Sequence, residues 1–370
     1  MNKFINHQLY RLTAVHIKEI VREPAVLFWG IVFPILMTWG LGIAFSSKKD
    51  MKSEIAIVQH NSSDFQKSAL YKVLEHHPDK QKGDFLLPLQ NAKLGNANLT
   101  FHECTEAEAH VLLKKGTVSL IIEIENGETH FKFDPANAEA QLLYQLVKGV
   151  VYNGAEYYTS HQEEIKPLTV AGTRYIDFLV PGLIAMGIMM SSSWGISYPL
   201  IERRSKKLLR RMVATPMRKS NMLIALIFAR FMMNLVESVL LFAFGWWYFD
   251  IHIQGNLAAL SLLFVAGNIA FAGIAVWISS HTSNSEVGNG LINAVVTPMM
   301  VLSGIFFSYH NFPDWAISVI QYLPLTMLAD SVRAVFNEGA GLMEVWKASL
   351  VLSTTGIITF IIGLKTFKWY

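Results

Sequence analysis

The sequence FLVPGLIAMGIMMSSSWGISYPLIERRSKKLLRRMVATPMRKSN occupies residues 178–221 and changes character at its middle. Residues 178–201 carry no charged side chain, and eight lysines and arginines follow within residues 203–219. Since a helix needs about 20 apolar residues to cross a bilayer, the first part predicts a transmembrane helix. The second part predicts a basic loop that holds one end of that helix at the membrane surface.

The composition of the whole chain agrees with a membrane protein that has a soluble part. Among its 370 residues, 52% are hydrophobic and 16% are charged, and the mean hydropathy is +0.33. Soluble proteins are about 25% charged. These values exclude a disordered chain, and the single cysteine, Cys104, excludes an intrachain disulfide. The net charge of +3 gives no reason to expect a nucleic-acid partner.

Apolar runs predict six membrane spans in total, and the fold class is an α-helical polytopic membrane protein with an inserted extracytoplasmic α/β domain. An amphipathic stretch, residues 1–23, precedes the first span and predicts a helix lying in the membrane interface, with a frayed terminus as the alternative. Spans two to six fall within residues 173–370. The predicted spans are residues 24–47, 178–201, 231–249, 256–279, 287–307 and 348–364.

The polar segment at residues 48–172 predicts a small folded α/β domain. Residues 53–60 alternate like a strand, and residues 117–133 form two strand-like runs around Asn126-Gly127, a typical hairpin turn. Residues 106–115 and 138–151 have helical spacing.

The distribution of basic residues predicts the orientation. Basic residues occur in the first 23 residues, in the loop at 203–219 and in the C-terminal tail, and six spans place all three on one side, the cytoplasm. The loop at residues 250–255 has no lysine or arginine and faces outward, and so does the α/β domain. Both chain termini are therefore expected in the cytoplasm.

Two groups of residues are candidates for function. Residues 202–214 have helical spacing that gathers Leu208, Leu209 and Met212 on one side, and this pattern fits either lipid headgroups or a cytoplasmic partner. Arg230 and Glu237 are ionisable residues in or beside the third span, where a charge is costly. Glu237 is expected to hydrogen-bond another helix, to contact substrate or to take up a proton.

Two motifs carry a resemblance to a known family. The first is PGLIAMGIMM at residues 181–190, followed by Glu202-Arg203 and LLRRMVATPM. The second is VLSGIFFSYHNFPDWAISVIQYLPLTMLADSVRAVFNEG at residues 301–339. Their order resembles the permease subunits of ABC-2 type transporters, although Ser308 stands where that family usually has proline.

The resemblance implies roles for several segments. Residues 202–214 would be a coupling helix that docks on an ATPase, residues 1–23 an elbow helix and residues 308–340 an extracytoplasmic re-entrant hairpin. The expected coupling residues are Glu202, Arg203, Arg204, Leu208, Leu209, Arg211 and Met212. The translocation path would lie between spans two and five of two subunits, with Met186, Met189, Ser193, Asn293, Thr297 and Met300 as candidate lining residues.

The resemblance also implies partners. Two copies of a separate ATP-binding subunit would carry ATP and magnesium, and a second permease copy, identical or related, would complete the path. Membrane lipid and a periplasmic adaptor are further expected partners, and the expected location is a bacterial cytoplasmic membrane. This chain has no P-loop pattern, no HExxH and no Cys/His cluster with metal-ligand spacing, so we expect no catalytic residue, metal or cofactor in it.

Two other functions stay open. An ion- or proton-coupled secondary transporter would use Glu237 and need no ATPase, and a non-transporting scaffold or sensor would use the α/β domain as a receptor. The methionine, tryptophan and serine side chains of the second span suit an amphiphile such as a drug, lipid or lipopeptide. Polysaccharide export by the same fold is the alternative.

Overall fold

The computed structural model divides the chain into two compact units. One unit comprises residues Met1–Ser47 and Val170–Tyr370, and the other comprises Lys48–Thr169. The structure describes residues 2–46, 51–59, 65–66, 68–74, 85–89, 97–125, 128–135, 137–153, 172–209 and 219–367.

Five helices in the described part of the chain are long and apolar enough to cross a membrane. The predicted starts of the third span, residue 231, and of the sixth span, residue 348, were too late. The helices continue through polar residues at their ends, since α11 begins at Lys219 and α16 at Leu342. The five spanning stretches are Pro24–Phe45, Tyr175–Ser205 (α9), Ser220–Phe249 of α11 (Lys219–Phe249), Leu257–Ser280 (α12) and Leu342–Thr366 (α16).

The predicted span at residues 287–307 corresponds to α13 (Ser285–Leu302), which has 18 residues. This helix is not among the five, and it carries Glu286, Asn289 and Asn293 in its first half. Polar groups of this kind lower its mean hydropathy. The count of six spans therefore stays a prediction.

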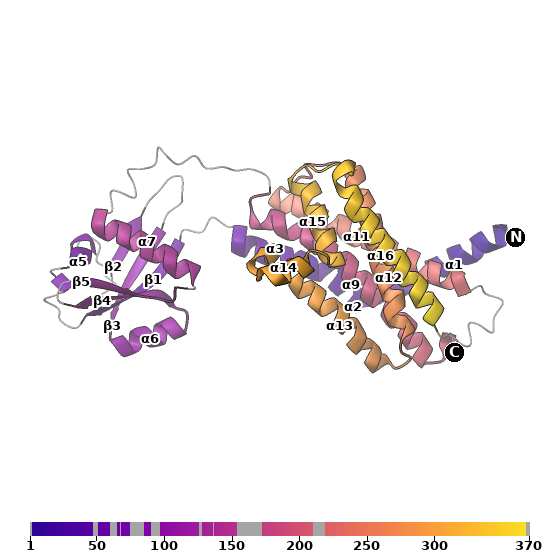
Figure 1. Ribbon diagram of the computed structural model, residues 1–370, viewed down its shortest axis with the longest axis horizontal. Coiled ribbons are helices and arrows are strands. Elements are labelled where there is room, and N and C mark those ends of the chain that lie inside the picture. Colours follow the sequence, from indigo (N-terminus) through magenta and orange to yellow (C-terminus); the bar gives the residue numbers. More distant parts are fainter. Residues whose placement is uncertain are drawn as a thin grey trace. The chain divides into compact units, whose positions relative to one another are not determined.

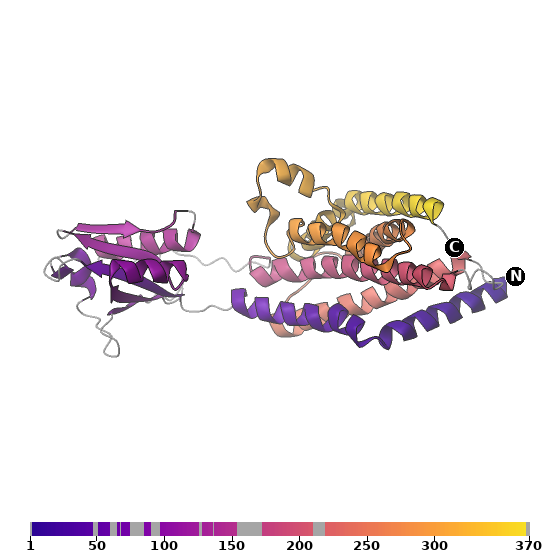
Figure 2. The ribbon, with the colours of Figure 1, turned by 90° about the horizontal axis from the view of Figure 1, so that it is seen from below.

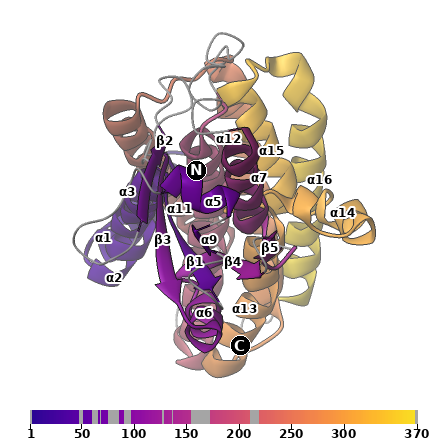
Figure 3. The same cartoon turned by 90° about the vertical axis from the view of Figure 1, so that its left-hand side faces the viewer.

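Helix α9 is the central helix of the helical unit. It packs against α3, α11, α12, α13 and α15, and most of its side chains are buried. Figure 3 shows α3 and α16 at opposite edges of this unit, with α9 between them. On the α16 side, Gly273 of α12 and Gly356 of α16 let the two backbones touch, since a Cβ on either would collide with the other helix.

The N-terminal helices form a rod that bends near Pro24. Helix α1 (Asn2–Val21) ends there, and α2 (Pro24–Leu27) begins with the proline, which lacks the N–H that would continue α1. The bend is visible in the indigo helices of Figure 2. A π-helical turn, η1 (Phe28–Val32), leads into α3 (Phe33–Ser46).

The segment after α13 contains a 3₁₀ turn, η2 (Tyr309–Asn311), and two helices, α14 (Asp314–Ile320) and α15 (Pro324–Asn337). Both helices start at a proline, since Pro313 precedes α14 as its N-cap and Pro324 is the first residue of α15. Helix α15 buries one face against α9 and α12. A re-entrant path through the membrane for this segment stays a prediction.

The second unit is a five-stranded sheet in the order β2-β3-β1-β4-β5, with three parallel strands in the middle and antiparallel edges. Ile55 and Ile57 of β1 face α7, whereas Ala56 and Val58 face α6. The side chains of this strand therefore alternate between two hydrophobic cores, one on each face of the sheet, as the pattern of residues 53–60 predicted. Figure 1 shows α6 and α7 on opposite faces of the sheet. The elements are β1 (Met51–Gln59), α5 (Ala69–Leu74), β2 (Phe85–Leu89), β3 (Ala97–Cys104), α6 (Glu106–Lys114), β4 (Val118–Glu125), β5 (Glu128–Lys132) and α7 (Ala138–Asn153).

The predicted hairpin and both predicted helices of this unit are confirmed. Strands β4 and β5 pair antiparallel on either side of Asn126-Gly127, although those two turn residues lie outside the described residues. Helix α6 begins at a capping box, in which Thr105 accepts from the Glu108 N–H and Glu108 accepts from the Thr105 N–H. Strands β2 and β3 were not predicted.

Candidate functional site

The basic loop begins differently from the predicted helix 202–214. Helix α9 continues through Ser205, and the chain then turns at Lys206 and Lys207, where Lys207 has a φ of 57°. Leu208 and Leu209 begin a new helical stretch, and residues 210–218, which include Arg211 and Met212, lie outside the described residues. Glu202, Arg203 and Arg204 thus belong to the end of a spanning helix, because the left-handed residue ends α9 before the loop.

The Arg204 side chain is buried and forms its hydrogen bonds inside the helical bundle. It is 6% exposed, and its Nη1 donates to Ser279 O at 2.8 Å and Thr282 O at 2.7 Å. Its guanidinium carbon lies 4.3 Å from the centre of the Phe367 ring. A cation that binds the last carbonyls of a helix also complements the helix dipole, so Arg204 fastens the end of α9 to the end of α12.

Arg203 and Glu202 make surface contacts. Arg203 Nη2 donates to Glu19 Oε2 of α1 at 2.8 Å and lies 3.3 Å from His16 Nδ1, which ties α1 to the end of α9. Glu202 accepts from Lys206 Nζ at 2.7 Å.

The two leucines at the start of the loop have different surroundings. Leu209 is buried with Leu200, Met222 and Leu223, whereas Leu208 is 38% exposed. Of the predicted coupling residues that the structure describes, Leu208 is therefore the apolar side chain most available to a partner.

A polar network crosses the interior of the bundle from α11. Arg230 Nε donates to Gly195 O of α9 at 2.9 Å. A Cβ at Gly195 would collide with the Arg230 guanidinium, so the glycine is needed for this crossing. Asn234 Nδ2 donates to Ser192 Oγ at 3.1 Å and to Asn268 Oδ1 at 2.6 Å, joining α9, α11 and α12. Polar side chains in membrane helices commonly form interhelical hydrogen bonds of this kind.

Glu237 is on α11 and is 8% exposed. Its carboxyl lies against Gly30, in the middle of the π-helical turn η1, where any side chain would displace it. It also interacts with Ser191 of α9 and with the charge of Arg230. Glu237 is thus held between three helices, which agrees with the first of its three predicted uses and leaves the other two untested.

The candidate path residues are only partly brought together within one chain. Met186, Met189 and Ser193 of α9 are buried in the helical core. Helix α13 packs on α9, and Gly288 lies against Ile201 in this contact. Met300 of α13 is half-buried and packs against the same hydrophobic core as Met186 and Met189, whereas Asn293 and Thr297 are exposed.

Arg333 forms an internal clasp that joins both ends of the second motif. Its Nη2 donates to Gly304 O at 2.7 Å, its Nε to Phe178 O at 3.1 Å, and its Nη1 to Asp330 Oδ1 at 3.1 Å. The guanidinium also stacks on the Phe178 ring at 3.6 Å. Gly304 has a φ of 67°, which suits glycine, and this conformation presents its carbonyl to the arginine.

Arg333 was noted in the motif but was not among the predicted site residues. The signal that could have identified it is an arginine inside the predominantly apolar run of residues 324–337, three residues after Asp330. Beside it, Tyr309 donates to Asp330 at 2.9 Å, and burial together with that carboxylate raises the pKa of Tyr309 to about 12. Ser308, the departure from the family pattern, caps η2 by accepting from the His310 N–H.

The contact of α1 with α9 is expected to weaken as the pH falls below 6.5. Burial lowers the pKa of His16 from 6.5, and Arg203 and Arg230 lower it further against the opposing effect of Glu19. A depressed histidine pKa favours the neutral ring in the folded state. The stabilisation is therefore complete above the unfolded value and is lost as the pH falls through the folded one.

Spin labels at positions 18 and 206, in a chain without Cys104, measure this contact. We expect the distance distribution to broaden between pH 7 and pH 5 in the parent protein and to stay constant in His16→Gln. An equal response in both proteins would assign the change to other groups.

Comparison with known proteins places the chain in a family. A model of ABC-2 family transporter proteins matches residues 24–365. This chain belongs to the ABC-2 transporter family. It is a multi-pass membrane transport protein, in agreement with the five spanning helices. Among the described residues, no group of three or more His, Cys, Asp or Glu side chains is placed to hold a metal ion.

Curated members of the wider ABC transporter group show partial similarity. The chain is 26% identical over 184 residues to ABC transporter G family member 20 of Dictyostelium discoideum, covering 49% of this chain and 25% of that protein. It is 23% identical over 187 residues to the probable multidrug ABC transporter permease YbhR of Escherichia coli K12, covering 48% of this chain and 50% of that permease. The chain thus matches a quarter to a half of these relatives.

Proposed function

We propose that this ABC-2 protein is the permease subunit of an ATP-driven exporter that moves an amphiphilic or hydrophobic compound out across a bacterial cytoplasmic membrane. The family match over residues 24–365 carries the proposal. The probable multidrug assignment of YbhR and the apolar side chains of α9 support an amphiphile rather than a polysaccharide as substrate.

Two ATP-binding subunits would bind ATP and magnesium and dock on the cytoplasmic face, and a second permease copy would complete the path. Six spans, cytoplasmic termini and an extracytoplasmic α/β unit are part of this proposal, as is a periplasmic adaptor on that unit. The docking segment is the loop that begins at Leu208.

Closure of the ATPase dimer would push this loop and so the end of α9. Arg204 then passes the movement to α12 and Arg203 passes it to α1, because each arginine is bonded to the neighbouring helix. Movement of α9 against α13 would open the path between the two permease copies. Such a shift requires that the loop contacts the two ATPase states differently.

The test uses Leu208, because Arg204 is structural and its reversal would report on folding. We expect Leu208→Asp to lower the amount of co-purified ATP-binding subunit by about tenfold, as for a truncated interface anchor. Leu208→Met, which keeps an apolar side chain, is the matched control and retains the subunit. Equal recovery with both variants would contradict docking at this loop.

Burial of Glu237 favours a second candidate function, an ion- or proton-coupled transporter. Transport by the purified chain in vesicles that have a pH gradient and no ATPase would support it. Transport that needs the ATPase and survives Glu237→Gln would exclude it.

A further inference from the structure

A groove with apolar walls lies between α9, α11 and α12, and the proposed coupling and path residues do not account for it. Its volume is about 350 Å³, and its walls are apolar side chains such as Phe228, Val265 and Ile269, each of which is more than a third exposed. This volume lies in the about 300–1,000 Å³ range of ligand sites. The groove is on the α11 side of α9, whereas the candidate path residues of α13 lie elsewhere.

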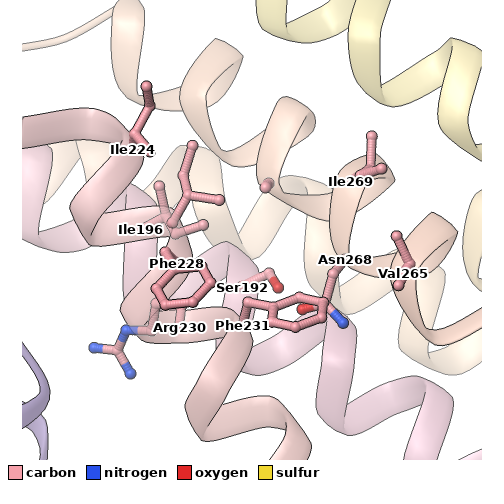
Figure 4. A pocket seen from close by; sticks show the side chains of 11 residues that line it. Ser192, Ile196, Ile224, Phe228, Arg230, Phe231, Val265, Asn268 and Ile269 are labelled. Atoms are coloured by element: carbon pink, nitrogen blue, oxygen red, sulfur yellow. The ribbon is translucent and has the colours of Figure 1, made fainter. Parts of the chain in front are cut away.

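The floor of the groove is polar and buried. Ser192 is 1% exposed and Asn268 is 6% exposed, and both line it. Figure 4 shows their polar atoms beside the Phe231 ring. Arg230 also lines the groove, but its Nε donates to Gly195 O and its guanidinium points away from the other lining side chains (Figure 4).

The floor of the groove keeps two hydrogens that no group among the described residues accepts. Within the described part of the chain, the Ser192 hydroxyl accepts from Asn234 and donates to no group. The Asn268 amide gives one hydrogen to Phe264 O and accepts from Asn234, which leaves its second hydrogen unused. Asn234 lies behind them and does not line the groove. An occupant that brings an acceptor satisfies both hydrogens, and a neutral carbonyl suits the two uncharged side chains that hold them.

The position of the groove indicates where the occupant comes from. Its α11 wall begins at Ile224, five residues after Lys219 and so about 8 Å along the helix. In the proposed topology this is the cytoplasmic leaflet, and exposed apolar walls at that depth face acyl chains.

We propose that this groove is an entry site for the exported compound, which is an acyl amphiphile with an ester or amide carbonyl taken from the cytoplasmic leaflet. Its chain lies along Phe228, Val265 and Ile269, and its carbonyl accepts from Ser192 and Asn268. The assignment of the occupant as cargo rests on the proposed export function.

Binding is tested on the purified full-length chain, which separates it from transport. The probes are a diacyl phosphatidylcholine and its dialkyl-ether analogue, and native mass spectrometry counts the bound molecules. We expect about three- to tenfold greater retention of the ester, the effect of one or two hydrogen bonds. Ser192→Ala is expected to reduce this preference, because it removes one of the two donors.

A bulky substitution that fills the groove, here called the plug, tests whether the probes bind there. Val265→Trp is expected to abolish retention of both probes, whereas Leu262→Trp, on the same helix and outside the groove, retains them; Val265 is 42% exposed and Leu262 is 38% exposed. Retention by Val265→Trp equal to that of the parent, or no preference for the ester, would overturn the site.

Transport distinguishes cargo from a resident lipid. With the ATP-binding subunit in proteoliposomes, the plug should abolish ATP-driven movement of a fluorescent diacyl lipid between leaflets. Unchanged movement together with lost binding would make the occupant a resident lipid and overturn its assignment as cargo. No movement by the parent complex would instead contradict the export function, and the binding experiment would still decide the site.

Discussion

Replacing Arg333 with methionine is expected to destabilise the helical unit by about 2–4 kcal/mol, since each buried carbonyl that loses its donor costs about 1–3 kcal/mol. The side chain is 10% exposed and donates to the carbonyls of Phe178 and Gly304, at longer distance to that of Ile305, and to a carboxylate. Methionine fills a similar volume, but it leaves the carbonyls of Phe178 and Gly304 without this donor. The ion pair with Asp330 adds less, because Asp330 is 39% exposed.

Arg333→Lys separates the hydrogen-bond geometry from the charge. Lysine keeps the cation but cannot present a planar fork to two carbonyls and a carboxylate, so we expect an intermediate loss. The measurement is the Tm of the purified chain in detergent, followed by ATP-dependent transport of the complex. A methionine variant with the parent Tm would show that the clasp contributes nothing to stability.

The second large effect is expected for Gly356→Leu, which should cost about 3 kcal/mol or more by overpacking. A Cβ at Gly356 would collide with the Ile269 carbonyl and lie 2.7 Å from the Ala270 Cα. Both obstacles are backbone atoms of α12, so no side chain can rotate to make room. Helices α12 and α16 would have to separate, and lipid cannot replace the lost packing.

Gly290→Leu is the matched control, because nothing lies within 4 Å of a Cβ at that position on α13. We expect its Tm to equal or exceed that of the parent, since leucine is the better helix former. If Gly356→Leu melted at the same temperature as this control, the close approach of the two backbones would be wrong.

The sequence determined which segments are helices in lipid and where several of them begin. Apolar runs predicted six spans, and five of these coincide with helices that are long and apolar enough to cross a bilayer, where the backbone has few alternatives. Pro24, Pro313 and Pro324 fixed helix starts through a missing N–H. In the soluble unit, the Asn-Gly pair and the alternation of β1 sufficed because they act over a few residues.

The tertiary structure alone decided what each polar residue does. Arg203, Arg204 and Arg333 look alike in a sequence, yet one binds α1, another the end of α12 and the third the start of α9. Arg204 and Arg333 have carbonyl partners 75 and 155 residues away. Periodicity gives the position of a residue along its helix, but the neighbour it faces depends on how the helices pack, which no local pattern encodes.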